Sequence, residues 1–175
     1  MSRPVQHFTL FSRLLHWGMA ILVLAMLFIG IGMVSTTSER YAGLLSVHKS
    51  IGIVILALVA IRLVNRLLHP PPPLPADLPD WQKVMAKASH VALYALMFAL
   101  PLVGWSMLSA GGYPIVIFGS LHLPAILPHD AATFAMLRSA HSLLAFGLFA
   151  VFLAHLGAAL FHALIREDEV LESMT

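Results

Sequence analysis

The chain has 175 residues, of which 59% are hydrophobic and only 10% are charged, with a formal net charge of +2. Soluble domains average roughly 25% charged residues, so this composition, with a mean hydropathy of +0.89, indicates an integral membrane protein. The basic residues are dispersed rather than clustered, which leaves nucleic-acid binding without support. There is no cysteine, which excludes disulfides, thiolate metal sites, iron–sulfur clusters and covalently attached c-type haem.

Four segments are long and apolar enough to cross a bilayer as helices, at about residues 12–34, 45–66, 86–107 and 139–165. The first is too long for a signal-peptide core and no small-residue cleavage site follows it, so we expect it to be retained. The second carries Lys49 and Arg62 near its ends, where long cationic side chains can reach the membrane surface. We therefore predict an all-α fold, with residues 1–175 forming one membrane domain built as a four-helix bundle.

The connections between these spans differ in character. A run of prolines at residues 70–73, followed by Pro75 and Pro79, cannot stay helical and indicates a stiff connector. Pro101 lies inside the third span, where we expect a kink that neighbouring helices compensate. Residues 110–137 are rich in glycine and proline but still apolar, and we expect them to lie on the membrane surface as a cap over one end of the bundle.

The distribution of lysine and arginine sets the expected orientation. Seven of the ten basic residues fall on one side of the membrane, namely Arg3, Arg13, Arg62, Arg66, Lys83, Lys87 and Arg166. The other three are Arg40, Lys49 and Arg138. Because the positive side stays inside, we expect both termini in the cytoplasm. The acidic tail counts little in this rule, and we expect it to be a solvated end; it comprises Glu167, Asp168, Glu169 and Glu172.

Three histidines, His141, His155 and His162, lie on the uncharged stretch of the fourth span. His141 and His155 are 14 residues apart, which puts them on one helix face and about 21 Å apart along the axis. One helix therefore offers a ligand near each membrane surface. Ionisable side chains are costly inside a bilayer, and they mark functional sites by default.

The depth of the other histidines follows from their places in the alternating spans. His48 begins the second span and so lies at the level of His141, near the periplasmic face. His16 lies one turn inside the first span and at the level of His155, near the cytoplasmic face. His90 begins the third span at a similar cytoplasmic level, so depth alone would let it replace His16 or His155.

Two stacked pairs of imidazoles suit haem b, which needs axial ligands on opposite faces of a wide ring enclosed by helices. Haem propionates also need cations at the membrane edge. Lys49 and Arg138 lie beside the periplasmic pair, and Arg13 lies three residues before His16. The alternative for each cation is a simple role as an interface anchor. The remaining histidines are expected at the membrane interface: His7, His69, His122 and His129.

Several motifs occur in a fixed order along nearly the whole chain. They are His16-Trp17, His48-Lys49-Ser50-Ile51-Gly52, Arg62-Leu63-Val64-Asn65-Arg66 before the proline run, Ser89-His90-Val91-Ala92-Leu93-Tyr94, Ala99-Leu100-Pro101-Leu102-Val103-Gly104, and His141 with His155. In this order and spacing they resemble the bacterial cytochrome b561 family. The resemblance implies an inner-membrane protein with two haem b groups that exchanges electrons with quinone. It assigns His48 and His141 to the periplasmic haem, and His16 and His155 to the cytoplasmic one.

From this resemblance we expect a quinone-linked electron-transfer oxidoreductase, passing electrons between a periplasmic donor or partner and the ubiquinone pool. One type of family member oxidises superoxide and reduces ubiquinone, and Lys49 and Arg138 would then attract the anion. An alternative is a haem-bearing membrane anchor of a larger redox complex, with residues 110–137 as its docking surface. A histidine-lined metal transporter is disfavoured, because the spans contain no Asp, Glu or Cys to bind a hydrophilic ion.

A quinone that reaches the cytoplasmic haem through lipid needs proton-exchanging donors near its carbonyls. His90 and His162 are expected at that depth without an assigned iron, and Lys83 and Lys87 lie near the same opening. An imidazole can both hydrogen-bond a quinone oxygen and pass a proton near neutral pH. We therefore predict a quinone site at His90, His162 and Lys87. The alternative is that these histidines only bond loop carbonyls at the interface.

Overall fold

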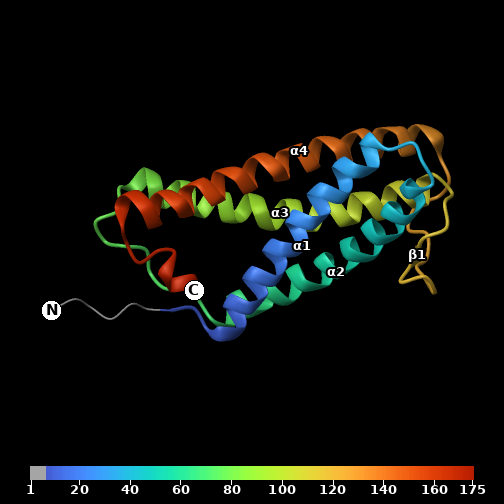
Figure 1. The fold of residues 1–175 in the computed structure, drawn as a ribbon. Helices are drawn as coiled ribbons and strands as arrows, with labels where there is room; N and C mark the ends of the chain where they lie inside the picture. The colour runs from blue at the N-terminus through green and yellow to red at the C-terminus, as the bar shows by residue number, and fades with distance from the viewer. Residues whose placement is uncertain (1–6) are drawn as a thin grey trace.

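The computed structural model describes residues 7–175, which form an elongated bundle of long helices (Figure 1). The helices are α1 (Leu10–Ser35), α2 (Arg40–Leu68), α3 (Asp80–Ala110) and α4 (Ala131–Phe161). All four are long and apolar enough to cross a membrane. This architecture confirms the all-α four-helix membrane fold predicted from the sequence. A π-helix, η1 (His162–Arg166), extends α4, and a short 3₁₀-helix, η2 (Glu172–Met174), lies in the tail.

Helices α1, α2 and α3 extend beyond the expected spans at both ends, whereas α4 begins eight residues before its expected span and ends at Phe161. Residues 131–137, which we expected in the cap, are therefore the first two turns of α4. The reason is a helix cap: the side chain of Asp130 accepts a hydrogen bond from the N–H of Thr133 at 2.7 Å. Hydrogen bonding from Thr133 also lowers the pKa of Asp130. The third helix, α3, stays continuous through Pro101.

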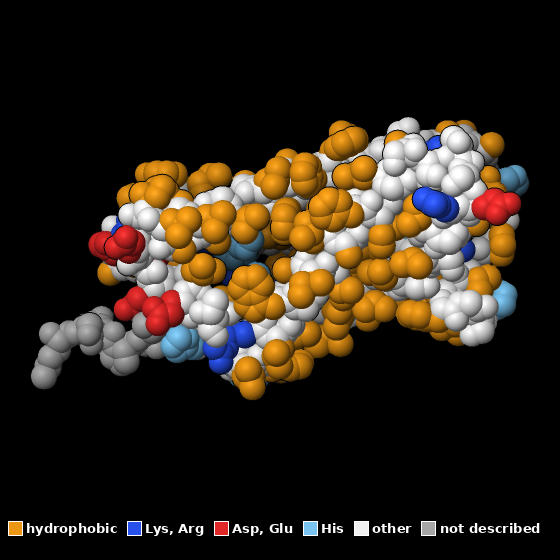
Figure 2. Space-filling view, in the orientation of Figure 1, with side chains coloured by type: hydrophobic (Ala, Val, Ile, Leu, Met, Phe, Trp, Pro, Cys, Tyr) orange, Lys and Arg blue, Asp and Glu red, His pale blue; other side chains and the backbone are white. Residues whose placement is uncertain are grey.

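Apolar side chains from all four helices meet in the middle of the bundle. The core cluster takes one buried residue from each: Val23, Ile55, Leu100 and Leu148. Outward-facing side chains are also largely apolar, and Figure 2 shows them over most of the visible face, with most of the charged side chains toward the two ends. Such a surface fits surrounding lipid, because the helices satisfy their own backbone groups and present hydrocarbon outward.

A short hairpin covers one end of the bundle. It consists of β1 (Val116–Ile117) paired antiparallel with β2 (Leu121–His122). Phe118 and Gly119 have positive φ angles of 51° and 76°, a conformation typical of tight hairpin connections. Ile117 is almost fully buried, and the N–H of Phe118 donates to Oγ of Ser50 on α2 at 2.9 Å. The segment therefore caps the end of the bundle at which His48 lies, which we call the His48 end.

The tail after η1 folds back onto the opposite end, which we call the His16 end. Nε1 of Trp17 donates to the main-chain oxygen of Met174 at 3.0 Å, and Arg13 donates to the main-chain oxygen of Thr175. The expectation of a solvated acidic tail is wrong for Asp168, whose side chain is only 15% exposed. It is right for the other three acidic residues, because Glu167, Glu169 and Glu172 are exposed.

Candidate functional site

Two pairs of histidines face one another, one pair at each end of the bundle. The ring centres of His48 on α2 and His141 on α4 are 6.1 Å apart. Those of His16 on α1 and His155 on α4 are 6.2 Å apart. Because His141 and His155 are separated by four turns of one continuous helix, the two pairs lie about 21 Å apart along the bundle.

These separations fit two imidazoles that share one metal ion. A metal–nitrogen bond is about 2 Å long and the ring centre lies about 1 Å farther, so opposed ligands have ring centres about 6 Å apart. In addition, Nδ1 of His48 is buried without a hydrogen-bond partner among residues 7–175. A buried polar atom without a partner is costly and calls for an explanation such as a bound group. The residues present therefore fit haem held by paired histidines.

The third helix passes close to the pair at the His48 end. A Cβ added at Gly104 would lie 3.3 Å from Cε1 of His141, which is tighter than ordinary van der Waals contact. Glycine at this position therefore lets α3 run beside the imidazole. Lys49 is half-buried and Arg138 is exposed at the same end, and neither forms an ion pair within residues 7–175.

At the His16 end, His155 has a second imidazole neighbour. The ring centre of His90 on α3 lies 5.4 Å from that of His155. The structure thus brings together His16, His90 and His155, three of the four histidines that the sequence placed near this depth. It does not place His162 in this group, since that residue lies two turns farther along the chain and bonds to Asp168.

Arg62 adds a cation to this cluster. One of its terminal nitrogens lies 2.8 Å from Nδ1 of His16, and its Nε donates to the hydroxyl of Tyr94 at 3.2 Å. An arginine can only donate, so Nδ1 of His16 accepts and the ring hydrogen is on Nε2. Ligation of a metal through Nε2 needs that hydrogen on Nδ1 instead. Haem binding through Nε2 would therefore release Arg62 from His16 and leave its charge available to another anion.

The sequence predicted Arg62 at the membrane surface and did not predict its contacts with His16 and Tyr94. A spacing signal was available: Arg62 follows His48 by 14 residues on α2, as His155 follows His141 on α4. A 14-residue step is four helical turns on one face. The same step separates His90 from Gly104 on α3. Three helices thus carry one residue of the site at each end of the bundle.

The other predicted residues lie at the ends of the bundle. Lys87 is exposed near the start of α3, and Lys83 pairs with Asp80 at 3.3 Å. Arg13 bonds to the tail rather than to a histidine among the described contacts. The histidines expected at the interface are all exposed: His7, His69, His122 and His129.

A four-helix membrane bundle with histidines paired across its interior has the architecture of a membrane-bound b-type cytochrome. The family model described as prokaryotic cytochrome b561 matches residues 7–175, so the chain belongs to the prokaryotic cytochrome b561 family. Membership implies a b-type haem and a role in electron transport, and it agrees with the four candidate membrane spans.

Three curated relatives resemble the chain over most of its length. Cytochrome b561 homolog 2 of Escherichia coli (strain K12) is 34% identical over 172 residues, which cover 97% of this chain and 91% of the relative. Cytochrome b561 homolog 1 of the same organism is 29% identical over 137 residues, covering 78% and 77%. A Yersinia pestis protein described as probable superoxide oxidase CybB is 33% identical over 132 residues, covering 73% and 72%.

Proposed function

We propose that this chain holds two haem b groups and transfers electrons between the periplasmic side of the membrane and the quinone pool. The observation that carries the proposal is the two histidine pairs, with ring centres 6.1 and 6.2 Å apart at opposite ends of one bundle. His48 and His141 hold one haem, and His16 and His155 hold the other. When bound, haem accepts and releases single electrons, and two histidine ligands leave its iron no open position for substrate.

The choice of His16 over His90 as the partner of His155 rests on ring separation. The 6.2 Å between His16 and His155 is closer to the separation of opposed ligands than the 5.4 Å between His90 and His155. On this assignment Arg62, released from His16, and Arg66 on the same helix would be the residues that offer cations to the haem propionates. Neither arginine forms an ion pair within residues 7–175, so both charges can offset carboxylates at this end.

The orientation that we propose places the His48 end at the periplasm and the His16 end at the cytoplasm of a bacterial inner membrane. Support comes from the excess of lysine and arginine in segments at the His16 end. Both termini of the single membrane domain, residues 1–175, are then cytoplasmic. The hairpin cap then lies at the periplasmic end of the bundle, and the folded tail lies at the cytoplasmic end.

Ubiquinone binds at the His16 end in this scheme, with His90, His162 and Lys87 around it. We expect quinone-dependent reoxidation of the reduced haems to slow at least tenfold in His90→Ala and His162→Ala proteins that retain both haems, because general acid–base groups contribute about 10²–10⁴-fold. Stopped-flow absorbance with a short-chain ubiquinone measures the rate. His122→Ala, altered in an exposed residue of the hairpin cap, is the matched control.

Unchanged rates and quinone affinities in both variants would place the quinone elsewhere. If ubiquinone did not reoxidise the reduced wild-type protein at all, the quinone-linked function would be wrong and the anchor-subunit alternative would be favoured.

Superoxide is the candidate electron donor favoured by two observations. Lys49 and Arg138 are cations at the His48 end that form no ion pair with any described residue, and one relative is described as a probable superoxide oxidase. We expect the double variant Lys49→Gln/Arg138→Gln to slow haem reduction by superoxide about tenfold at low ionic strength, since electrostatic steering raises association rates by about 10–10³-fold. Rates should be measured against salt concentration, because screening removes the difference. Lys83→Gln, at the opposite end, is the control, and an equal loss in that variant would contradict steering by Lys49 and Arg138.

A further inference from the structure

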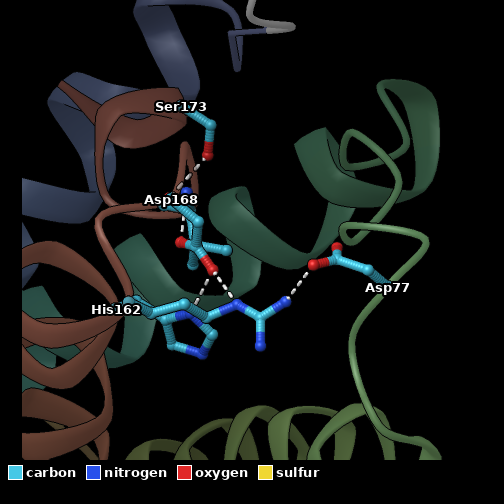
Figure 3. Close-up of polar contacts among 6 residues, drawn as sticks. Asp77, His162, Asp168 and Ser173 are labelled. Carbon is cyan, nitrogen blue, oxygen red and sulfur yellow. Dashed lines mark hydrogen bonds and ion pairs between the residues drawn. The ribbon is translucent and has the colours of Figure 1, made fainter.

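A chain of charged contacts holds His162 at the end of α4 (Figure 3). Nδ1 of His162 lies 2.7 Å from Oδ2 of Asp168. The same carboxylate oxygen lies 2.7 Å from Nε of Arg166, and a terminal nitrogen of Arg166 donates to Asp77 at 2.6 Å. The His162 and Asp168 side chains are only 14% and 15% exposed. The network therefore connects the last turn of the membrane helix to the tail and to the connector between α2 and α3.

The backbone is shaped to bring Asp168 back over His162. The chain leaves α4 through the π-helix η1, and Glu167 then adopts a left-handed conformation with φ of 52°. This turn lets the N–H of Asp168 donate to the main-chain oxygen of His162 at 3.2 Å. Non-glycine residues in this conformation and short π-helical segments are both uncommon, and both concentrate at functional sites.

Asp168 is held at both of its carboxylate oxygens. Oδ2 faces His162 and Arg166, while Oδ1 accepts a hydrogen bond from the N–H of Val170 at 3.1 Å. Ser173 fastens the same turn, since its hydroxyl donates to the main-chain oxygen of Val170 at 2.8 Å. A carboxylate fixed in this way keeps the hydrogen of the imidazole on Nδ1 and fixes the direction of the ring. Nε2 is then the nitrogen that is free to exchange a proton.

We propose that Asp168 is a positioning residue that orients His162 as the proton donor to bound quinone. The inference rests on the proposed quinone-linked function. Bound haem would supply the electrons one at a time. For each electron that the quinone gains, Nε2 of His162 would donate one proton to a quinone oxygen, and the imidazole would regain a proton from cytoplasmic water; two electrons and two protons complete the quinol. Asp168 holds Nδ1 and so fixes the direction in which Nε2 donates.

The contacts between His162 and the charged groups around it predict how replacement of each group affects the imidazole. Asp168 is in direct contact, Arg166 competes for the same carboxylate oxygen, and Asp77 binds only the far side of Arg166. Glu167 and Glu169 are exposed on the same tail. Removal of Asp168 should therefore release Nδ1 of the imidazole, whereas removal of Arg166 leaves the contact between His162 and Asp168 in place. Asp77, whose side chain is 80% exposed, should have little effect.

The test is the pH dependence of haem reoxidation by a short-chain ubiquinone in the full chain with both haems bound. For a proton donor, the rate falls as pH rises. We expect Asp168→Asn to slow the reaction about tenfold at neutral pH, because the imidazole is no longer held in the donating orientation. Asp168→Glu should restore most of the rate, because the charge is kept. The control Asp77→Asn should match the wild type in both rate and pH profile.

Each other outcome overturns the inference. A slower Asp168→Asn protein whose rate Asp168→Glu does not restore would make Asp168 only a structural residue of the tail, and a persistent alkaline fall in His162→Gln would assign the proton donor to another group. If Asp168→Asn fails to retain both haems, Asp168→Ser replaces it, with the same slowing expected and an unchanged rate contradicting the proposal. If ubiquinone cannot reoxidise the wild-type protein at any pH, the proposed quinone-linked function is wrong. The wild-type measurement therefore distinguishes a failure of that function from a failure of the role proposed for Asp168.

Discussion

Replacement of His48 or His141 by alanine is expected to remove about half of the bound haem while the other half persists. The two rings lie 6.1 Å apart on α2 and α4, and the other histidines near this end, His122 and His129, are exposed. No described imidazole can therefore replace either ligand. Haem extraction and the reduced-minus-oxidised visible spectrum of the purified protein, each divided by protein concentration, measure the loss.

His122→Ala should keep the full haem content, which separates ligand loss from a general effect of removing a histidine near the cap. Full haem content in both the His48 and the His141 variants would show that the pairing is wrong. The remaining haem also reports on folding, because a variant that had lost the bundle would hold neither group.

Replacement of His155 by alanine is expected to abolish the other haem, because that residue adjoins both candidate partners at the His16 end. His16→Ala should have the same effect, whereas His90→Ala should retain both haems. The physical reason is geometric: the 6.2 Å separation from His16 fits opposed ligands better than the 5.4 Å separation from His90. The same pigment measurement applies.

Haem content would also reveal the opposite assignment, in which His90 rather than His16 is the ligand. A His90 variant with about half of the haem, together with a His16 variant with all of it, would assign His90 as the ligand. His16 would then keep its contact with Arg62 when haem is bound, and the quinone site would lose one of its proposed donors.

The number of helices and the pairing of histidines by depth could be predicted from the sequence. Lipid allows only long, internally hydrogen-bonded apolar segments, so four uncharged runs specify four spans. A rise of about 1.5 Å per residue then converts sequence position into depth. Depth calculated in this way correctly predicted that His48 lies beside His141 and His16 beside His155. It also predicted His90 at the level of the second pair.

Lateral contacts were decided only by the tertiary structure. Depth does not say which side of a helix meets which neighbour, so Arg62 was expected at the membrane surface although it contacts His16. The tail is a second example of a contact that the sequence did not predict. Its charge predicted a solvated end, but one left-handed residue, Glu167, reverses the chain and returns Asp168 to His162. The sequence determined what each level of the bundle contains, because lipid and helical rise act along one axis. Contacts across that axis depend on how helices and turns pack, which a one-dimensional pattern does not encode.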